Sequence, residues 1–125
     1  MRQARILVVE DEAVVAMSEC FVLESLGYQV TSSVASGEQA IAAAERECPD
    51  LVLMDVRLQG RMSGVEAARE IHRRFGIPIV FVTANDGDEL EVADLPSPGA
   101  RIPKPFTDEQ LERTLQQTLG GTGTF

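Results

Sequence analysis

Residues 5–10 (RILVVE), 51–55 (LVLMD), 77–83 (IPIVFVT) and 100–104 (ARIPK) are short apolar runs, and each one ends in a polar residue. Such runs are typical of buried parallel strands, which are apolar on both faces. In open α/β sheets, ligands bind at the carboxyl ends of the strands. The sequence therefore predicts one shared sheet edge that carries the following polar residues: Glu10, Asp11, Asp55, Thr83 and Lys104.

The remaining sequence alternates between strand and helix patterns, which indicates a parallel sheet with helices on both faces. Glycine and proline residues between Ala84 and Gly99 leave only a short or mobile fourth helix at 88–95. Ser36 and the pair Thr107 and Gln110 are expected to cap helices. The expected strands cover 5–10, 28–34, 50–55, 78–83 and 100–103, and the expected helices cover 13–26, 37–47, 64–75, 88–95 and 107–119.

The chain has 125 residues and a formal charge of −9, which suits one domain over 1–119 followed by a flexible tail over 120–125. The sequence contains no basic run, so we expect neither direct nucleic-acid binding nor binding to an anionic membrane. It also has no secretory or membrane-spanning segment, and Cys20 and Cys48 lack metal-like spacing. These features favour a cytoplasmic domain whose partners are proteins and cations.

The acidic residues at the predicted edge suit a hard divalent cation, because Mg²⁺ and Mn²⁺ prefer oxygen ligands. Glu10 and Asp11 follow the first strand directly, and Asp55 follows a strand that the topology sets beside it. Screened by a cation, Asp55 can act as a nucleophile toward phosphorus. Two simpler explanations stay open: acidic residues favour helix starts, and Asp is common at strand-to-loop turns.

Lys104 and Thr83 complete this predicted site. Phosphoryl transfer needs positive charge on the phosphoryl oxygens, which the Lys104 ammonium would supply, and the Thr83 hydroxyl would donate a hydrogen bond to them. Taken singly, a lysine is usually solvated and a threonine is a common strand residue. The prediction therefore rests on the placement of both residues at consecutive strand ends.

The motifs ILVVEDE, LVLMD, VFVT and KPF, in this order and spacing, resemble the receiver domain of two-component response regulators. The resemblance runs from about Arg5 to Leu119. It implies a flavodoxin-like, doubly wound sheet of five parallel strands in the order 2-1-3-4-5, with five helices. It also implies these roles: Asp55 as phosphoacceptor, Glu10 and Asp11 as the acidic pair, Thr83 as switch hydroxyl and Lys104 as phosphoryl-pairing lysine.

By the same resemblance, Asp11, Asp55 and the backbone carbonyl of Arg57 would bind Mg²⁺, and Glu10 would act through water. The phosphoryl donor would be a sensor histidine kinase or a phosphotransfer protein, and the output a changed contact with a downstream protein or a dimer. The domain would catalyse only its own phosphorylation and dephosphorylation. Positions that modulate these reactions would be Arg57, Ala84, Asn85 and Arg101.

Several residues depart from the common receiver pattern. Receivers usually have Tyr or Phe three positions before the lysine, where the ring swings in concert with the threonine, but this chain has Arg101 there. This usual aromatic relay is therefore in doubt. Pro103 fits only an edge strand, and the Lys104–Pro105 bond is expected to be cis, as in the family. The loop DVRLQGRMSGVE and the KPF motif are similar to the FATGUY receiver subgroup, whose members are often single-domain proteins.

Several functions stay open at this point. The chain is either a stand-alone signalling module or phosphate sink, or the receiver part of a hybrid kinase or transcription factor. A flavodoxin-type redox protein would need a phosphate loop where EDEA stands. An aspartate-nucleophile phosphatase usually has a second Asp where Arg57 stands.

Overall fold

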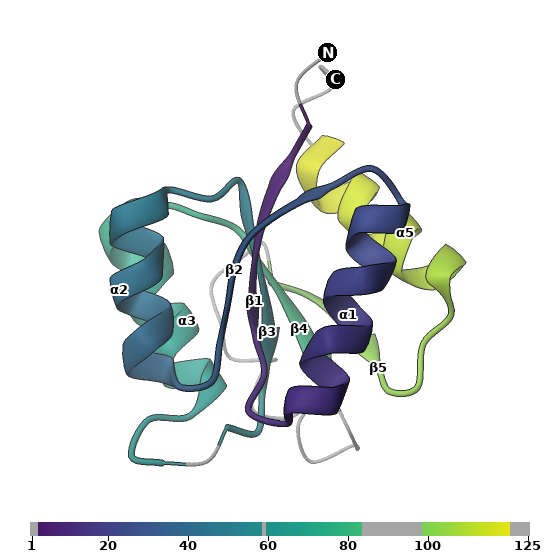
Figure 1. Cartoon of the computed structure of the whole chain (residues 1–125). Helices are drawn as coiled ribbons and strands as arrows, with labels where there is room; N and C mark the ends of the chain where they lie inside the picture. The colour runs from purple at the N-terminus through teal and green to yellow at the C-terminus, as the bar shows by residue number, and fades with distance from the viewer. Residues whose placement is uncertain (1–2, 59, 84–98, 121–125) are drawn as a thin grey trace.

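The computed structural model describes residues 3–58, 60–83 and 99–120, which form an α/β sandwich around one parallel sheet (Figure 1). The sheet has five strands in the order β2-β1-β3-β4-β5, as predicted, and every pairing is parallel. The strands are β1 (Arg5–Val9), β2 (Gln29–Val34), β3 (Leu51–Asp55), β4 (Ile79–Thr83) and β5 (Gly99–Pro103).

Four helices cover the two faces of this sheet. Figure 1 shows α2 and α3 on one side and α1 and α5 on the other. Their bounds are α1 (Ala13–Ser25), α2 (Gly37–Glu47), α3 (Gly64–Phe75) and α5 (Asp108–Leu119). The predicted fourth helix at 88–95 lies outside the described residues. None of the described helices has the length and apolarity that a membrane crossing requires.

Side chains cap the starts of three of the described helices, and two of these caps are the ones that the sequence predicts. The Ser36 side chain accepts a hydrogen bond from the backbone N–H of Gln39 at the start of α2. At α5, Thr107 and Gln110 form a reciprocal capping box, and Ser63 and Glu66 form another at α3. These side chains satisfy N–H groups that have no partner within the helix, so each helix begins at a defined residue.

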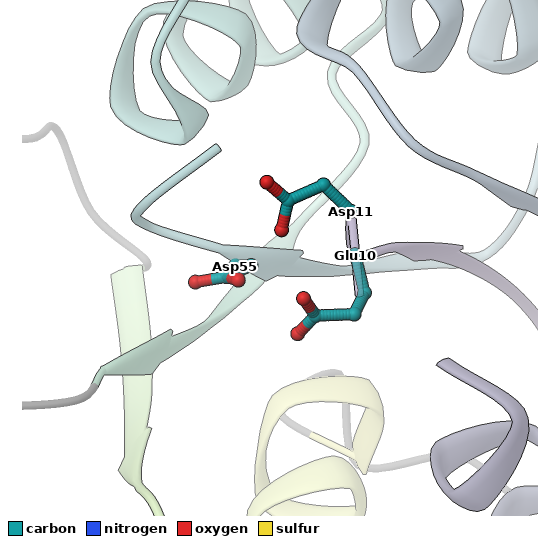
Figure 2. Close-up of side chains that lie close together, drawn as sticks. All are labelled: Glu10, Asp11 and Asp55. Carbon is teal, nitrogen blue, oxygen red and sulfur yellow. The ribbon is translucent and has the colours of Figure 1, made fainter. Parts of the chain in front are cut away.

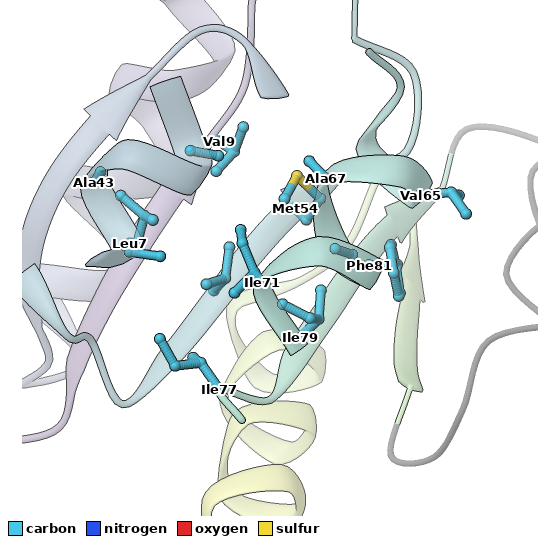
Figure 3. Packing of buried hydrophobic residues seen from close by; sticks show 14 of the residues in the cluster. Leu7, Val9, Ala43, Met54, Val65, Ala67, Ile71, Ile77, Ile79 and Phe81 are labelled. Carbon is cyan, nitrogen blue, oxygen red and sulfur yellow. The ribbon is translucent and has the colours of Figure 1, made fainter. Parts of the chain in front are cut away.

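The core consists of two apolar clusters, because successive residues of a strand point to opposite faces of the sheet. Leu7, Val9, Met54 and Phe81 pack with α2 and α3, as Figure 3 shows for this cluster. Ile6, Val8, Leu53 and Val82 belong to the opposite cluster, which includes residues of α1 and α5. The sheet is therefore buried on both faces, and polar groups are confined to its edges and strand ends.

The chain order places the carboxyl ends of β1 and β3 next to each other at a topological switch point. From β1 the chain crosses to β2 on one side and then returns to β3 on the other side of β1. A crevice for ligands is expected at such a point. At the far edge, Pro103 is the last residue of β5, and the Lys104–Pro105 bond is cis, as predicted.

Gly64, the first residue of α3, allows this helix to begin directly against the end of β3. Its N–H donates to the Val56 carbonyl over 3.1 Å, and a Cβ at this position would overlap the Asp55 carbonyl oxygen. Backbone cannot move aside as a flexible side chain can. A glycine is therefore required here for α3 to start beside the site.

We predict that Gly64→Ala lowers the free energy of unfolding by about 1–3 kcal/mol, the usual cost of overpacking a close-packed site. The matched control is Gly37→Ala at the start of α2, where the atoms nearest to the added Cβ belong to the side chain of Met62 and not to backbone. Urea denaturation of both variants measures the difference. Equal losses in the two variants would contradict the requirement for glycine at Gly64.

Candidate functional site

Glu10 and Asp11 follow the last residue of β1 and begin the turn into α1. The Glu10 N–H donates to the Val34 carbonyl of β2 over 3.0 Å, which continues the strand pairing by one residue. The Glu10 side chain is buried, and its Oε2 accepts a hydrogen bond from the Glu12 backbone N–H over 3.0 Å. The backbone therefore holds the Glu10 carboxylate in a fixed orientation.

Asp55 is the last residue of β3 and only 6% exposed. Its Oδ1 accepts a hydrogen bond from the Arg57 backbone N–H over 3.0 Å, and Oδ2 lies 3.6 Å from the Nζ of Lys104. One oxygen is thus held by the turn that follows the strand. The other faces the charged groups of the neighbouring strand ends.

The carboxylates of Glu10, Asp11 and Asp55 each offer an oxygen atom within 4.8 Å of the others (Figure 2). Two of the three residues are buried, which sets the group apart from ordinary exposed acidic clusters. Buried like charges repel one another strongly unless a cation compensates them. The all-oxygen donor set fits a hard divalent cation such as Mg²⁺.

Lys104 brings the positive charge to this cluster. Its backbone N–H donates to the Thr83 carbonyl over 2.8 Å, and its Nζ lies 3.1 Å from Oε1 of Glu10. Lys104 is the single lysine of the chain. Thr83 ends β4 and is 2% exposed. The structure therefore brings the predicted residues Glu10, Asp11, Asp55, Thr83 and Lys104 to one edge of the sheet.

The electrostatics of the site follow from burial and from these neighbours. Burial raises the pKa of Asp55 to about 6; the Arg57 N–H opposes this shift, the Glu10 charge adds to it and Lys104 opposes it. Burial alone would lower the pKa of Lys104, but the hydrogen bond to Glu10 and the charges of Asp55 and Glu10 raise it. The lysine is therefore a firmly charged ammonium beside a carboxyl that titrates close to neutrality.

Two of the four predicted modulating positions, Arg57 and Arg101, lie within the described residues. Arg57 is exposed directly beyond the end of β3. Arg101 is also exposed, and it pairs in register with the buried Phe81 of β4. Ala84 and Asn85 lie outside the described residues.

Sequence reasoning missed Glu19, a buried residue in the middle of α1. It is 4% exposed and shares the buried face of the helix with Ala16 and Leu23. Residues three before and four after a position lie on the same helical face, but α1 also has apolar residues on its exposed side, so the spacing alone does not show which face is buried. A charged residue between two apolar core positions of a helix marks a buried ionisable group.

The chain is similar to a known protein family, to curated proteins and to solved structures. Residues 6–116 match the response regulator receiver domain. The phyllosphere-induced regulator PhyR of Methylorubrum extorquens is 30% identical over 115 residues, which cover 91% of this chain and 43% of that protein. The chain spans about half the length of the curated relatives it matches.

Two solved receiver domains share the fold over nearly the whole chain. The receiver of a modulated diguanylate cyclase from Desulfovibrio desulfuricans has a TM-score of 0.89 and 28% identity, and covers 98% of both chains. The receiver of the sensor histidine kinase PA1611 from Pseudomonas aeruginosa has a TM-score of 0.85 and 39% identity over 95% of this chain and 99% of its own. That structure holds a magnesium ion coordinated in its active site cleft. The chain therefore belongs to the response regulator receiver domain family, whose members are phosphoacceptor signalling modules of two-component systems rather than conventional enzymes.

Proposed function

We propose that this domain accepts a phosphoryl group on Asp55 from a sensor histidine kinase or a phosphotransfer protein. One observation carries the proposal: the Asp55 carboxylate lies at the switch point of the sheet beside the acidic pair, and the ammonium of Lys104 contacts both Glu10 and Asp55. A nucleophile, a set of cation ligands and a fixed positive charge are the groups that phosphoryl transfer requires.

The residues present fit a divalent cation, Mg²⁺ or Mn²⁺. Asp11, Asp55 and the backbone carbonyl of Arg57 would hold it, with Glu10 acting through water. The support is the mutual approach of three carboxylates within 4.8 Å and the magnesium ion in the related PA1611 receiver. When bound, the cation supplies charge neutralisation that allows an anionic donor to approach.

The residues of the site would have different roles in the reaction. A carboxylate oxygen of Asp55 forms a bond to phosphorus while the bond from phosphorus to the donor imidazole nitrogen breaks, and that nitrogen keeps the electron pair. The Lys104 ammonium, 3.6 Å from Asp55 Oδ2, pairs with the phosphoryl oxygens. The product is an acyl phosphate, toward which the Thr83 hydroxyl turns and donates a hydrogen bond.

We infer that the output is a changed protein contact, with Arg57, Ala84, Asn85 and Arg101 as modulating positions. The loop of residues 55–66, the Phe81–Thr83 stretch and the KPF motif support a FATGUY-like receiver, acting in the cytoplasm as a stand-alone module or phosphate sink. A receiver within a longer hybrid kinase is the second candidate, because the PA1611 domain belongs to a sensor histidine kinase.

Phosphotransfer from purified histidine kinases carrying labelled phosphate tests the phosphoacceptor directly. We expect the wild-type protein to gain label with Mg²⁺ present and Asp55→Asn to stay at background, because the amide is not a nucleophile toward phosphorus. Asp108→Asn, an exposed acidic residue of α5, is the matched control and should be labelled like wild type. Full labelling of Asp55→Asn would refute the assignment.

The raised pKa of Asp55 predicts how metal-free stability depends on pH. A carboxyl with a pKa of about 6 when folded and an ordinary value of 3.8 when unfolded resists ionisation in the fold. The favourable contribution of the uncharged carboxyl to the free energy of unfolding is complete below the unfolded pKa. This contribution is lost as the pH rises through the folded pKa of about 6. We therefore expect metal-free Asp55→Asn to exceed wild type in unfolding free energy by about 1–3 kcal/mol at neutral pH.

Chemical denaturation with a chelator present, at acidic and at neutral pH, measures this difference. The advantage of Asp55→Asn should disappear toward the ordinary pKa of an aspartate, and added Mg²⁺ should stabilise wild type at neutral pH much more than the variant. An advantage that is the same at both pH values would show that packing, and not charge, is its cause.

A further inference from the structure

Glu19 is a buried carboxyl that the proposed reaction does not use. It is 4% exposed, and within the described part of the chain no hydrogen-bond donor reaches its Oε2. A buried polar atom without a partner is unfavourable, so packing alone gives no reason for a carboxyl here. The reason for a carboxyl at position 19 must therefore lie in the groups that surround it.

A cavity of about 470 Å³ lies between α1 and the segment that leads from β5 into α5; we refer to it as the α1–α5 cavity. Glu19 lines it from α1 together with Val15 and Val22, and Lys104 and Phe106 line it from the opposite side. The Lys104 side chain is 26% exposed and also contacts Glu10. One ammonium therefore borders both the acidic site and the cavity that contains Glu19.

Charged groups from several elements surround Glu19. Burial raises the pKa of Glu19 to about 8, the charge of Glu10 directly after β1 adds to this, Lys104 opposes it and Asp55 on β3 adds to it. Asp108 of α5 lines the same cavity. At neutral pH the carboxyl is mostly uncharged, and a modest rise in pH ionises it.

We propose that Glu19 is a positioning residue for Lys104 in the phosphoryl transfer proposed above, on which this inference rests. While the Glu19 carboxyl is uncharged, the ammonium stays beside Glu10 and Asp55, where it meets the phosphoryl group. Once Glu19 is ionised, it offers a competing partner, and the ammonium moves into the α1–α5 cavity. A single lysine, shared between two sets of carboxyls, then sets the alkaline limit of the reaction.

The single lysine makes the position of its ammonium directly observable. Protein labelled with ¹³C at lysine Cε gives one side-chain NMR signal, that of Lys104. In metal-free wild type we expect this signal to shift with a midpoint near 8, where Glu19 ionises. Glu19→Gln and Glu19→Leu should lose this alkaline midpoint.

The matched control for this titration is Glu24→Gln, which removes the same charge from an exposed position of α1. It should keep the alkaline midpoint. An alkaline midpoint that persists in both Glu19 variants, or that is missing from wild type, would overturn the positioning role. Glutamine has the shape of glutamate, and leucine tests the same point without a polar group, so the result does not depend on one variant.

The rate of phosphorylation by acetyl phosphate with Mg²⁺ connects this position to the reaction. From neutral to alkaline pH we expect the wild-type rate to fall by about three-fold or more relative to Glu19→Gln, because only wild type ionises at this position. Parallel pH profiles would overturn the proposal. If no variant is phosphorylated at all, the proposed function fails, while the lysine titration still reports separately on the pairing with Glu19.

Discussion

The structure depends on the compensation of negative charge at one buried sheet edge. Glu10 and Asp55 are almost fully buried, and the carboxylate of Asp11 lies close to theirs. The positively charged ammonium of Lys104 contacts both Glu10 and Asp55. A buried pair gains from attraction only if its geometry is good, and an uncompensated buried charge is strongly unfavourable. Because the chain also has a net charge of −9, this edge of the sheet favours the binding of a cation.

The fold holds these charges in place through its backbone. Separate N–H groups fix one oxygen of Glu10 and one of Asp55, and a backbone hydrogen bond joins Lys104 to Thr83. The strands behind them are buried on both faces, and Gly64 lets α3 begin against the Asp55 carbonyl. Groups held in this way need little rearrangement when a phosphoryl group arrives, which is how preorganised sites stabilise developing charge.

The sequence predicts this edge well because each of its features has a local cause. Buried parallel strands read as apolar runs, and the polar residue after each run must lie at the carboxyl edge. The strand order and the cis Lys104–Pro105 bond, expected from family resemblance, are also present in the structure. The strand bounds differ by only one residue at some ends, as for β1, which stops at Val9 before the turn.

Glu19 shows where sequence reasoning was insufficient. The helix AVVAMSECFVLES carries apolar residues on its exposed side as well, with Val14, Met17 and Phe21 all largely exposed. An apolar pattern without a clear polar face does not indicate which side is buried. The proximity of Glu19 to Lys104 further depends on how α1 packs against the β5–α5 segment. That is a tertiary contact between residues far apart in the sequence, with no local signal.

Arg101 makes the usual aromatic relay from the site to the protein surface unfavourable in this chain. It pairs with Phe81 across β4 and β5 and is exposed, whereas Phe81 is buried. An aromatic side chain can swing between a buried and an exposed position at modest cost, but a guanidinium loses hydration when it is buried. A relay in which this side chain turns inward behind Thr83 is therefore unfavourable. The hydrogen bond from the Lys104 N–H to the Thr83 carbonyl connects β4 directly to the segment that leads into α5. The proposed pairing of Lys104 with Glu19 would therefore bear on contact between the site and α5 as well as on the proposed reaction.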